Sequence, residues 1–433
     1  MEPERALHKA AHIVVVSVGT LGDMYPFISI GKAMQQRGHR VTFLAPAVHE
    51  DIVQGAGLAF HALGSREDYL ALINDPDLWD SQKSFATLWR GMLGNLKEIP
   101  TFIDSLPADE HCLLLTHPFA LPAAALARAR RPDLPIVGAY VAPANMRTVH
   151  DPLTIGPIRV PRWLPVSWRR WIWQRIDAKL IDPIAVPDLN AERARKGFKP
   201  VAHVIEHMHT VADLSLTLFP SWYAKDQPDW PQPRHGGDFP LYDPKPGQAL
   251  SAEVQRFLAK GDAPIVFTPG TGHKHGSRYF VHALDAVTRL GRRAIFLTPF
   301  REQLPSTLSG AVLWQSYVPL PALLPRAAAI VHHGGVGTTA EAMRAGIPQV
   351  VVPLAHDQFD NGARVEALGV GRSIRAARAS GPGLKSALAS LLSSSSVSVQ
   401  CKDVAMRLAA TPNAAATCEA IEGALIARRR NPS

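Results

Sequence analysis

The fold of this chain is decided by residues 330–361, which read IVHHGGVGTTAEAMRAGIPQVVVPLAHDQFDN. The apolar run that ends at residue 331 has the length and bulk of a buried parallel strand. The glycines of 334–337 then allow a tight turn and a close approach of the backbone to a ligand. A helix and a second strand, 349–352, complete a strand–loop–helix–strand unit, so the stretch predicts a parallel α/β sheet.

The predicted helix begins at the glycine-rich loop. Thr338 and Thr339 stand where N-cap residues belong, and Gly346 stands where the helix ends. A loop of this kind presents unpaired N–H groups and the positive end of the helix dipole, which together suit an anion such as a diphosphate. The expected diphosphate contacts are His333, Gly335, Val336, Gly337 and Thr338.

Polar side chains follow the second strand. Asp357 and Gln358 come shortly after it, at the carboxyl edge of the sheet, where open α/β folds bind ligands. A carboxylate beside an amide can hold the hydroxyls of a polyol. This edge is therefore expected to bind a sugar.

The amino-terminal part of the chain repeats the pattern. A strand at 13–18, a turn at 19–23, a helix and a strand at 40–45 predict a β-α-β unit. The turn lacks the Gly-x-Gly-x-x-Gly fingerprint, and the second strand ends without the acidic residue that would hold a nicotinamide ribose. A dehydrogenase is therefore disfavoured.

These motifs resemble those of the family 1 glycosyltransferases. His-His-Gly-Gly-x-Gly-Thr at 332–338, followed by Asp-Gln-x-x-Asn at 357–361, is similar to the donor-binding motif of that family. Gly-x-x-Gly-Asp-x-x-Pro-Phe at 19–27 resembles the amino-terminal domain of its bacterial members. The resemblance spans essentially the whole chain. It implies the GT-B fold, an α/β architecture in which two Rossmann-like domains face each other across a cleft.

The resemblance also implies a domain plan. A proline-dense stretch after residue 219 indicates a linker, and the last apolar helix would cross back to brace the first domain. The expected parts are an acceptor-binding domain at 1–232, a linker at 233–250, a nucleotide-sugar-binding domain at 251–413 and a returning helix at 414–433.

A catalytic base is implied in the first loop. Many family members carry a histidine there, and a bacterial subset carries an aspartate. This chain has Asp23, next to Gly22, so the resemblance implies that Asp23 takes the proton of the acceptor. A strand at 112–116 ends at His117, which would open onto the same crevice. His117 can pair with Asp23, touch the acceptor or serve the structure alone.

Two further stretches are expected near the donor. The turn after the strand at 264–268 is a second glycine loop, and its Thr271 and Gly272 can approach the diphosphate. Tyr317 and Val318 lie where relatives stack the nucleotide base and hydrogen-bond its edge through the backbone.

Within the family, the chain looks similar to the rhamnolipid rhamnosyltransferase branch over the segments 74–80, 219–222, 229–233 and 355–361. This implies an inverting, metal-independent transfer of L-rhamnose from dTDP-L-rhamnose to the hydroxyl of a 3-(3-hydroxyalkanoyloxy)alkanoate. The nucleotide sugar would be the co-substrate, with no other cofactor, and a partner enzyme could make the acceptor. UDP-glucose-dependent transfer to a sterol, carotenoid or polyketide fits the same motifs. A non-catalytic sugar-nucleotide-binding partner subunit and, less favoured, a sugar-nucleotide epimerase are alternatives from other classes.

Composition agrees with a soluble protein of two domains. The 433 residues suit two domains of about 200 residues each, with 46% hydrophobic and 19% charged residues. The formal charge of +9 suits an anionic partner such as a nucleotide sugar or an acidic lipid, and the scattered basic residues disfavour nucleic acid. The three cysteines match no metal spacing. We expect a cytoplasmic protein, with peripheral contact to the inner face of the cytoplasmic membrane left open.

Three segments allow several interpretations. Residues 66–106 look helical, and their apolar stripe, which includes Trp79, Phe85, Leu88 and Met92, is most simply core packing. Residues 159–186 interleave four tryptophans with arginines. Such a helix can line an apolar acceptor pocket, rest on an anionic membrane surface or simply pack on its domain. The serine-rich stretch 389–398 is expected to be a loop.

Overall fold

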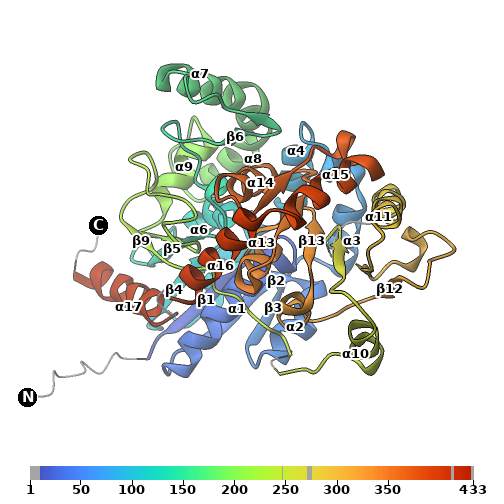
Figure 1. Ribbon diagram of the computed structural model, residues 1–433. Coiled ribbons are helices and arrows are strands. Elements are labelled where there is room, and N and C mark those ends of the chain that lie inside the picture. Colours follow the sequence, from blue (N-terminus) through green and yellow to red (C-terminus); the bar gives the residue numbers. More distant parts are fainter. Residues whose placement is uncertain (1–9, 246, 271–275, 411–413, 431–433) are drawn as a thin grey trace, which may run out of the picture.

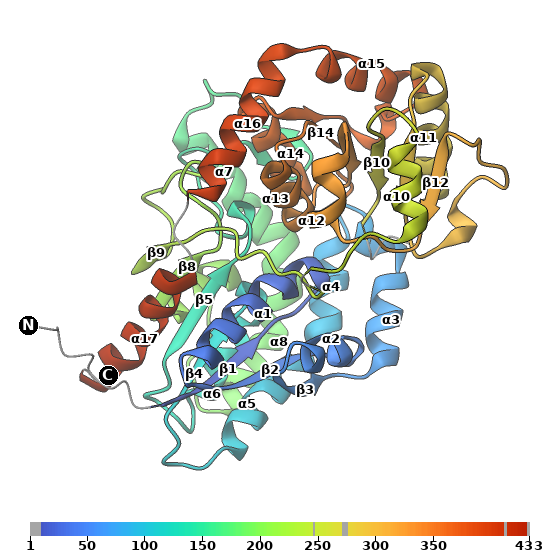
Figure 2. The same cartoon turned by 60° about the horizontal axis from the view of Figure 1, so that its bottom comes forward.

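The computed structural model describes residues 10–245, 247–270, 276–410 and 414–430. The described chain forms two α/β units, each built on a parallel sheet with helices around it (Figure 1). Figure 2 shows the orange and red carboxyl-terminal unit above the blue amino-terminal one. The predicted α/β architecture with two Rossmann-like units is confirmed.

The first sheet of the described residues has seven strands, in the order β3-β2-β1-β4-β5-β8-β9. All neighbours are parallel, and β1 and β4 are buried along their whole length, as expected for strands covered on both faces. The bounds are β1 (His12–Val16), β2 (Arg40–Pro46), β3 (Ala59–Leu63), β4 (Cys112–Thr116), β5 (Ile136–Tyr140), β8 (Leu214–Thr217) and β9 (Arg234–Gly236).

Two strands of this sheet depart from the sequence-based expectations. The edge strand β3 was not expected, because most of its residues are exposed and it lacks an apolar run. The other edge strand, β9, pairs with β8 through Ser215 and Arg234, inside the range predicted as linker. The linker therefore begins after Gly236.

The second sheet, within the same described ranges, has six parallel strands in the order β12-β11-β10-β13-β14-β15. Apolar side chains pack on both of its faces in two separate clusters, so this sheet too is a buried central layer. The bounds are β10 (Ile265–Thr268), β11 (Ala294–Leu297), β12 (Val312–Gln315), β13 (Ala329–His332), β14 (Gln349–Val351) and β15 (Gly371–Ser373).

Seventeen α-helices surround the sheets in the described chain, and none of them is long and apolar enough to cross a bilayer. A π turn at Asp177–Ile181 joins α7 to α8, and a short hairpin of β6 (Thr154–Ile155) and β7 (Ile158–Arg159) precedes them. The helices are α1 (Leu21–Gln36), α2 (Glu50–Gly55), α3 (Arg66–Asn74), α4 (Ser84–Met92), α5 (Asn95–Ser105), α6 (Leu121–Ala127), α7 (Val166–Ile176), α8 (Asp182–Arg195), α9 (Val204–Val211), α10 (Ala252–Ala259), α11 (Ser277–Leu290), α12 (Leu320–Leu323), α13 (Val336–Ala345), α14 (Gln358–Ala367), α15 (Gly381–Leu392), α16 (Ser395–Ala409) and α17 (Ala414–Arg430).

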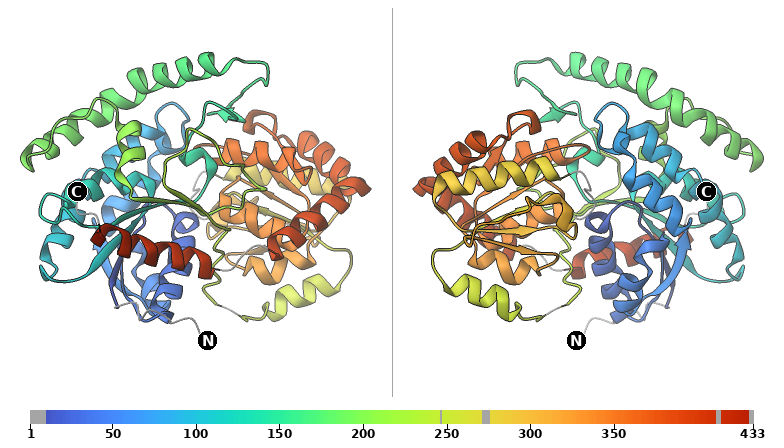
Figure 3. Two further views of the ribbon diagram at one scale, coloured as in Figure 1. Left: turned by 90° about the vertical axis from the view of Figure 1, so that its left-hand side faces the viewer. Right: turned by 90° about the vertical axis from the view of Figure 1, so that its right-hand side faces the viewer.

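The last helix, α17, lies on the amino-terminal unit (Figure 3). It contacts α1, β8 and β9. Glu422 accepts two hydrogen bonds from the Arg37 guanidinium, each 2.7 Å long, while Cys418 and Ile421 are fully buried. An ion pair and an apolar stripe thus hold the carboxyl-terminal helix against the first unit.

The serine-rich stretch is helical, so the loop expected at 389–398 is wrong. α15 ends at Leu392 and α16 begins at Ser395. The Ser394 hydroxyl accepts a hydrogen bond from the N–H of Val397 and caps α16. The serines therefore stop one helix and start the next, which is a common use of this residue type.

The connections between strands place the site. In each sheet the winding reverses beside a central strand, between β1 and β4 in the first unit and between β10 and β13 in the second. Loops diverge at such a reversal and leave a crevice at the carboxyl ends of the strands. The two crevices hold the residues that the sequence motifs single out.

Candidate active site

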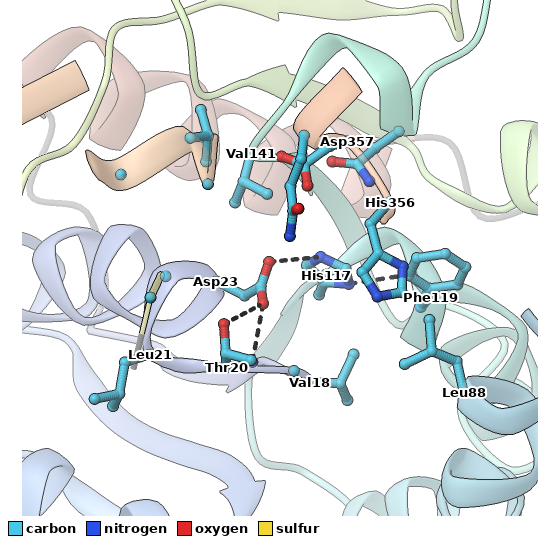
Figure 4. Close-up of a pocket in the computed structure, with 18 of the residues that line it drawn as sticks. Val18, Thr20, Leu21, Asp23, Leu88, His117, Phe119, Val141, His356 and Asp357 are labelled. Carbon is cyan, nitrogen blue, oxygen red and sulfur yellow. Dashed lines mark hydrogen bonds and ion pairs between the residues drawn. The ribbon is translucent and has the colours of Figure 1, made fainter. Parts of the chain in front are cut away.

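A cavity of about 1010 Å³ is lined by residues from both units. The first unit contributes the loops after β1 and β4, and the second contributes those after β10, β13 and β14. Figure 4 shows His356 and Asp357 approaching Asp23 and His117 from the opposite side of the cavity. All of the described site residues predicted from the sequence line this cavity: Gly22, Asp23, His117, Tyr317, Val318, His333, Gly335, Val336, Gly337, Thr338, Asp357 and Gln358.

The glycine-rich loop aims the start of α13 at the cavity. Gly334 has a φ of +97°, and a Cβ there would lie 2.6 Å from Val351 Cγ1, so only glycine fits. The N-cap is Gly335, and the expectation that Thr338 and Thr339 cap the helix is wrong. Both threonines lie within the first turns, and the Thr339 hydroxyl donates back to the Gly335 carbonyl at 3.0 Å. The first N–H groups of α13 therefore face the cavity without a side-chain cap.

The two adjacent histidines have different surroundings. His332 is fully buried; its Nε2 bonds to Gln349 Oε1 at 2.9 Å, and its Nδ1 accepts from the N–H of Gly334 at 3.1 Å. Burial lowers the pKa of His332 to about 4, so it is a neutral structural residue that shapes the loop. The ring of His333 lies between Gly270 and Gly335, where a Cβ would come within 2.7 Å of the ring in either case. Glycine on both sides admits this ring to the cavity wall.

Asp23 lies in the first turn of α1 rather than in an open turn. One carboxylate oxygen accepts a hydrogen bond from the N–H of Thr20 at 2.9 Å, which completes a capping box. The other oxygen lies 4.0 Å from His117 Nε2. Burial raises the pKa of Asp23 to about 6, so the carboxylate is ionised at neutral pH yet far more basic than a surface aspartate.

His117 follows β4 and faces Asp23. Its Nδ1 accepts a hydrogen bond from the N–H of Phe119 at 3.3 Å, which assigns the proton of the neutral ring to Nε2, on the side of Asp23. Burial lowers the pKa of His117 to about 3, so the ring stays neutral. At 4.0 Å the two groups are beyond hydrogen-bond range, so the ring N–H faces the carboxylate without bonding to it.

Asp357 and Gln358 lie at the start of α14. Gln358 Oε1 accepts from the N–H groups of Leu354 and Ala355, at 2.8 and 3.1 Å, so its carbonyl end shapes the loop. Asp357 accepts a hydrogen bond from Asn361 at 2.7 Å. Burial and the negative charge of Asp23 raise the pKa of Asp357 to about 7. Two carboxylates from different units therefore face each other across the cavity.

The remaining donor-side predictions are placed as follows. Tyr317 is half-exposed on the cavity wall, and Val318 is mostly buried beneath it. Thr271 and Gly272 lie outside the described residues. Their neighbour Gly270 has a φ of +94° and contacts the ring of His333, so the second glycine loop reaches the first at this point.

Several lining residues were missed or misassigned from the sequence. The predicted linker contributes residues 240–244, among them Tyr242, whose ring lies 5.6 Å from that of Tyr25. The stripe at 79–92 is not simply core, because Trp79, Phe85, Leu88 and Met92 line the cavity while Trp89 is buried behind them. An apolar stripe looks the same whether it meets a core or a cavity, so the sequence carries no signal that separates the two.

No group of three or more histidine, cysteine, aspartate or glutamate side chains in the described chain is placed to hold a metal ion. At the start of α13, the cavity is lined by the residues of the glycine-rich loop and by the ring of His333.

The comparisons with known proteins match both units. Residues 13–106 match the Glycosyltransferase family 28 N-terminal domain, and residues 282–423 match the Erythromycin biosynthesis protein CIII-like, C-terminal domain. The chain is 28% identical over 440 residues to the O-mycaminosyltylonolide 6-deoxyallosyltransferase of Streptomyces fradiae, covering 95% of this chain and 96% of that protein.

Solved structures share the fold. The glycotransferase of kitacinnamycin superposes with a TM-score of 0.71 at 19% identity, covering 96% of this chain and 99% of that one. The spinosyn rhamnosyltransferase SpnG complexed with thymidine diphosphate superposes with a TM-score of 0.66 at 21% identity, covering 95% and 100%. The two matched domains, the full-length relative and the shared architecture together identify this chain as a glycosyltransferase of the GT-B fold.

Proposed function

We propose that this glycosyltransferase moves L-rhamnose from dTDP-L-rhamnose to the hydroxyl of a lipophilic acceptor such as a 3-(3-hydroxyalkanoyloxy)alkanoate. The transfer inverts the configuration at the anomeric carbon and needs no metal. One observation carries the proposal: a single cavity joins the uncapped start of α13, the Asp23 carboxylate and an extended apolar wall. These three features suit a diphosphate, a hydroxyl proton and an acyl chain, respectively.

The acceptor side of the cavity is apolar. Trp79, Phe85, Leu88 and Met92 come from the helical region 66–106, and Phe119 follows His117. Burying an acyl chain against such a wall is favourable by about 25 cal/mol for each Å² of apolar surface removed from water. An acceptor lying along this wall would bring its hydroxyl toward Asp23.

The reaction is a single displacement. Asp23 accepts the proton of the acceptor hydroxyl while that oxygen forms a bond to the anomeric carbon. The bond from this carbon to the diphosphate breaks, and the electron pair leaves with the nucleoside diphosphate. The N–H groups of the 334–339 loop, His333 and Thr338 meet the charge that develops on the leaving oxygen. Asp357 and Gln358 lie where sugar hydroxyls would be held.

The donor assignment is supported by fold neighbours. The spinosyn rhamnosyltransferase is a protein of this fold described with thymidine diphosphate. In this chain the half-exposed ring of Tyr317 offers a surface for a nucleotide base on the same cavity wall. A thymidine nucleotide and a deoxyhexose are therefore our first choice.

A polyketide acceptor is a second candidate. The full-length relative from Streptomyces fradiae is described as an O-mycaminosyltylonolide 6-deoxyallosyltransferase. The cavity volume of about 1010 Å³ has room for a ring system as well as for an acyl chain. UDP-glucose is the alternative donor.

Thermal-shift binding tests the donor. Ligands that bind only the folded state raise the melting temperature by mass action, and dTDP and dTDP-L-rhamnose are expected to do so at lower concentrations than UDP and UDP-glucose. Transfer to the hydroxyalkanoyloxyalkanoate is then followed by product mass. A preference for the uridine pair, or transfer to a polyketide alone, would contradict the proposal.

The pH profile should report Asp23. Burial raises its pKa to about 6, and only the ionised carboxylate can accept a proton. We therefore expect kcat/KM to rise with pH up to about 6 and to level off above it, because the active fraction is lost as pH falls through the pKa. This acidic limb should be missing from the residual activity of the Asp23→Asn variant. A profile unaltered in that variant would assign the limb to another group.

EDTA is expected to leave transfer unchanged, since the charge of the leaving diphosphate is met by N–H groups and His333 in this proposal. The measurement is the initial rate with and without chelator. Loss of activity that magnesium restores would overturn the metal-free mechanism.

A further inference from the structure

Three of the large apolar side chains exposed in the described chain lie on or just before α7. Trp163, just before the helix, is 79% exposed, and Trp168 and Trp171 are 61% and 57% exposed. Figures 1 and 3 show α7 at the outer edge of the molecule, away from both sheets. Large aromatic side chains left in water need a reason.

The other side of α7 packs against the protein. Arg169 is buried, and its guanidinium donates to the carbonyl of His150 at 2.6 Å. Trp173, one turn further on, lines the cavity, and its ring lies 4.3 Å from the Arg147 guanidinium. Residues 169 and 173 thus mark the inner side, and the exposed tryptophans at 168 and 171 mark the outer one.

The outer surface is also basic. From residue 158 to 180 the chain has six basic residues and one acidic residue. The acid, Asp177, is already paired with Arg147. Of the basic residues, Arg162, Arg170, Arg175 and Lys179 are exposed alongside the tryptophans. This mixture of exposed indole rings and exposed positive charge complements the interface of an anionic bilayer.

The same segment borders the cavity. Thr154 and Gly156 of the preceding hairpin, together with Trp173 and Ile181, belong to the cavity wall. A surface held against the outer side of α7 would therefore lie next to one edge of the acceptor site. The chain has no helix among its described residues that could cross the bilayer, so this contact would be peripheral.

We propose that the outer surface of α7, formed by Trp163, Trp168, Trp171, Arg162, Arg170 and Arg175, docks the enzyme on an anionic phospholipid membrane. The indole rings enter the interfacial layer, and the guanidinium groups meet the lipid phosphates. Docking would present the cavity edge to an acceptor dissolved in the membrane, a consequence that rests on the proposed lipophilic acceptor. The docking itself does not depend on which sugar is transferred.

The test is flotation of the full chain with vesicles of phosphatidylcholine, with and without phosphatidylglycerol. Wild type should bind the anionic vesicles only, and added salt should weaken binding because it screens the attraction. Trp168→Ser with Trp171→Ser should lower the partition coefficient by about tenfold or more. Arg170→Gln with Arg175→Gln should lower it by about fivefold per residue.

The matched control lies on α16, which also exposes apolar and basic side chains on one side. Val399 and Met406 are 62% and 65% exposed, and Lys402 lies between them. The triple variant Val399→Ser, Lys402→Gln and Met406→Ser should bind vesicles as wild type does. Equal loss in the α7 and α16 variants, or no binding by wild type, would overturn the proposal.

Further measurements separate membrane docking from self-association and from the proposed function. If wild type elutes as a dimer that the two tryptophan substitutions convert to a monomer, without vesicle binding, the surface belongs to a second copy of this chain and the proposal is wrong. Transfer to a short-chain, water-soluble acceptor is measured separately, and the α7 variants should retain it. Vesicle binding without any sugar transfer would contradict the proposed function and support membrane docking. Sugar transfer without vesicle binding would support the proposed function and contradict membrane docking.

Discussion

Asp23→Asn is expected to lower the rate of sugar transfer by about 10²–10⁴-fold, the usual contribution of a general base. The asparagine keeps the size of the side chain and an oxygen that can accept from the N–H of Thr20, so the start of α1 should survive. What is lost is the basic carboxylate oxygen that faces His117. The measurement is kcat with saturating donor, accompanied by the dissociation constant for dTDP, which should not change.

A matched control separates catalysis from helix capping. Asp68 has the same place in the capping box of α3, where its carboxylate accepts from the Ser65 hydroxyl at 2.6 Å, but it lies on the exposed rim of the cavity rather than beside His117. Asp68→Asn should therefore leave the turnover close to that of wild type. If Asp23→Asn turns over like Asp68→Asn, Asp23 is a capping residue only and the base lies elsewhere.

Asn361→Ala is expected to destabilise the protein by about 2–5 kcal/mol and to weaken dTDP binding at the same time. Asn361 is fully buried; its amide donates to the Gly334 carbonyl at 2.9 Å and to Asp357 at 2.7 Å, and it accepts from the Tyr223 hydroxyl at 2.9 Å. One side chain thus joins the glycine loop, the sugar-side carboxylate and the first unit. Truncation removes a partner from two buried groups, the Gly334 carbonyl and the Tyr223 hydroxyl, and from the half-buried Asp357 carboxylate.

Two further variants separate the loss of stability from the loss of dTDP binding. Tyr223→Phe removes only one of the three bonds and should cost about 1 kcal/mol. Asn190→Ala removes a comparable pair of bonds, to the backbone of Val201, away from the cavity. It should destabilise the protein without changing the dTDP dissociation constant. Urea unfolding and dTDP titration are the two measurements, and an Asn361→Ala variant that binds dTDP as tightly as Asn190→Ala would contradict the role of Asn361 in shaping the site.

The central strands could be predicted because both of their faces are buried. Strands β1, β4 and β13 are largely apolar runs with no exposed residue. A short run of that kind is typical of a strand that is covered on both faces of a parallel sheet. The edge strands β3 and β9 were missed because exposure on one side removes the signal. Their pairing is decided by the neighbouring strand rather than by their own side chains.

Local motifs predicted which residues line the cavity but not how those residues are held. Gly334 has a φ of +97°, a conformation that favours glycine, so the tight turn can be inferred from the spacing of the glycines. The position of the N-cap at Gly335, and the use of Gln358 to hold its own loop, depend on contacts that a linear pattern does not contain.

The sequence by itself determined the parallel α/β architecture and the glycine-rich turn, because both follow from apolar patterning and local spacing. The resemblance to glycosyltransferase motifs named Asp23 and Asp357 as site residues. Only the tertiary structure decided that Asp357 faces Asp23 across the cavity. It also decided that the stripe at Trp79 lines a cavity rather than a core, and that Trp168 and Trp171 are exposed to solvent. The physical reason is that the burial of a side chain and the pKa of a carboxyl group depend on which residues lie opposite them. That neighbour comes from a different part of the chain.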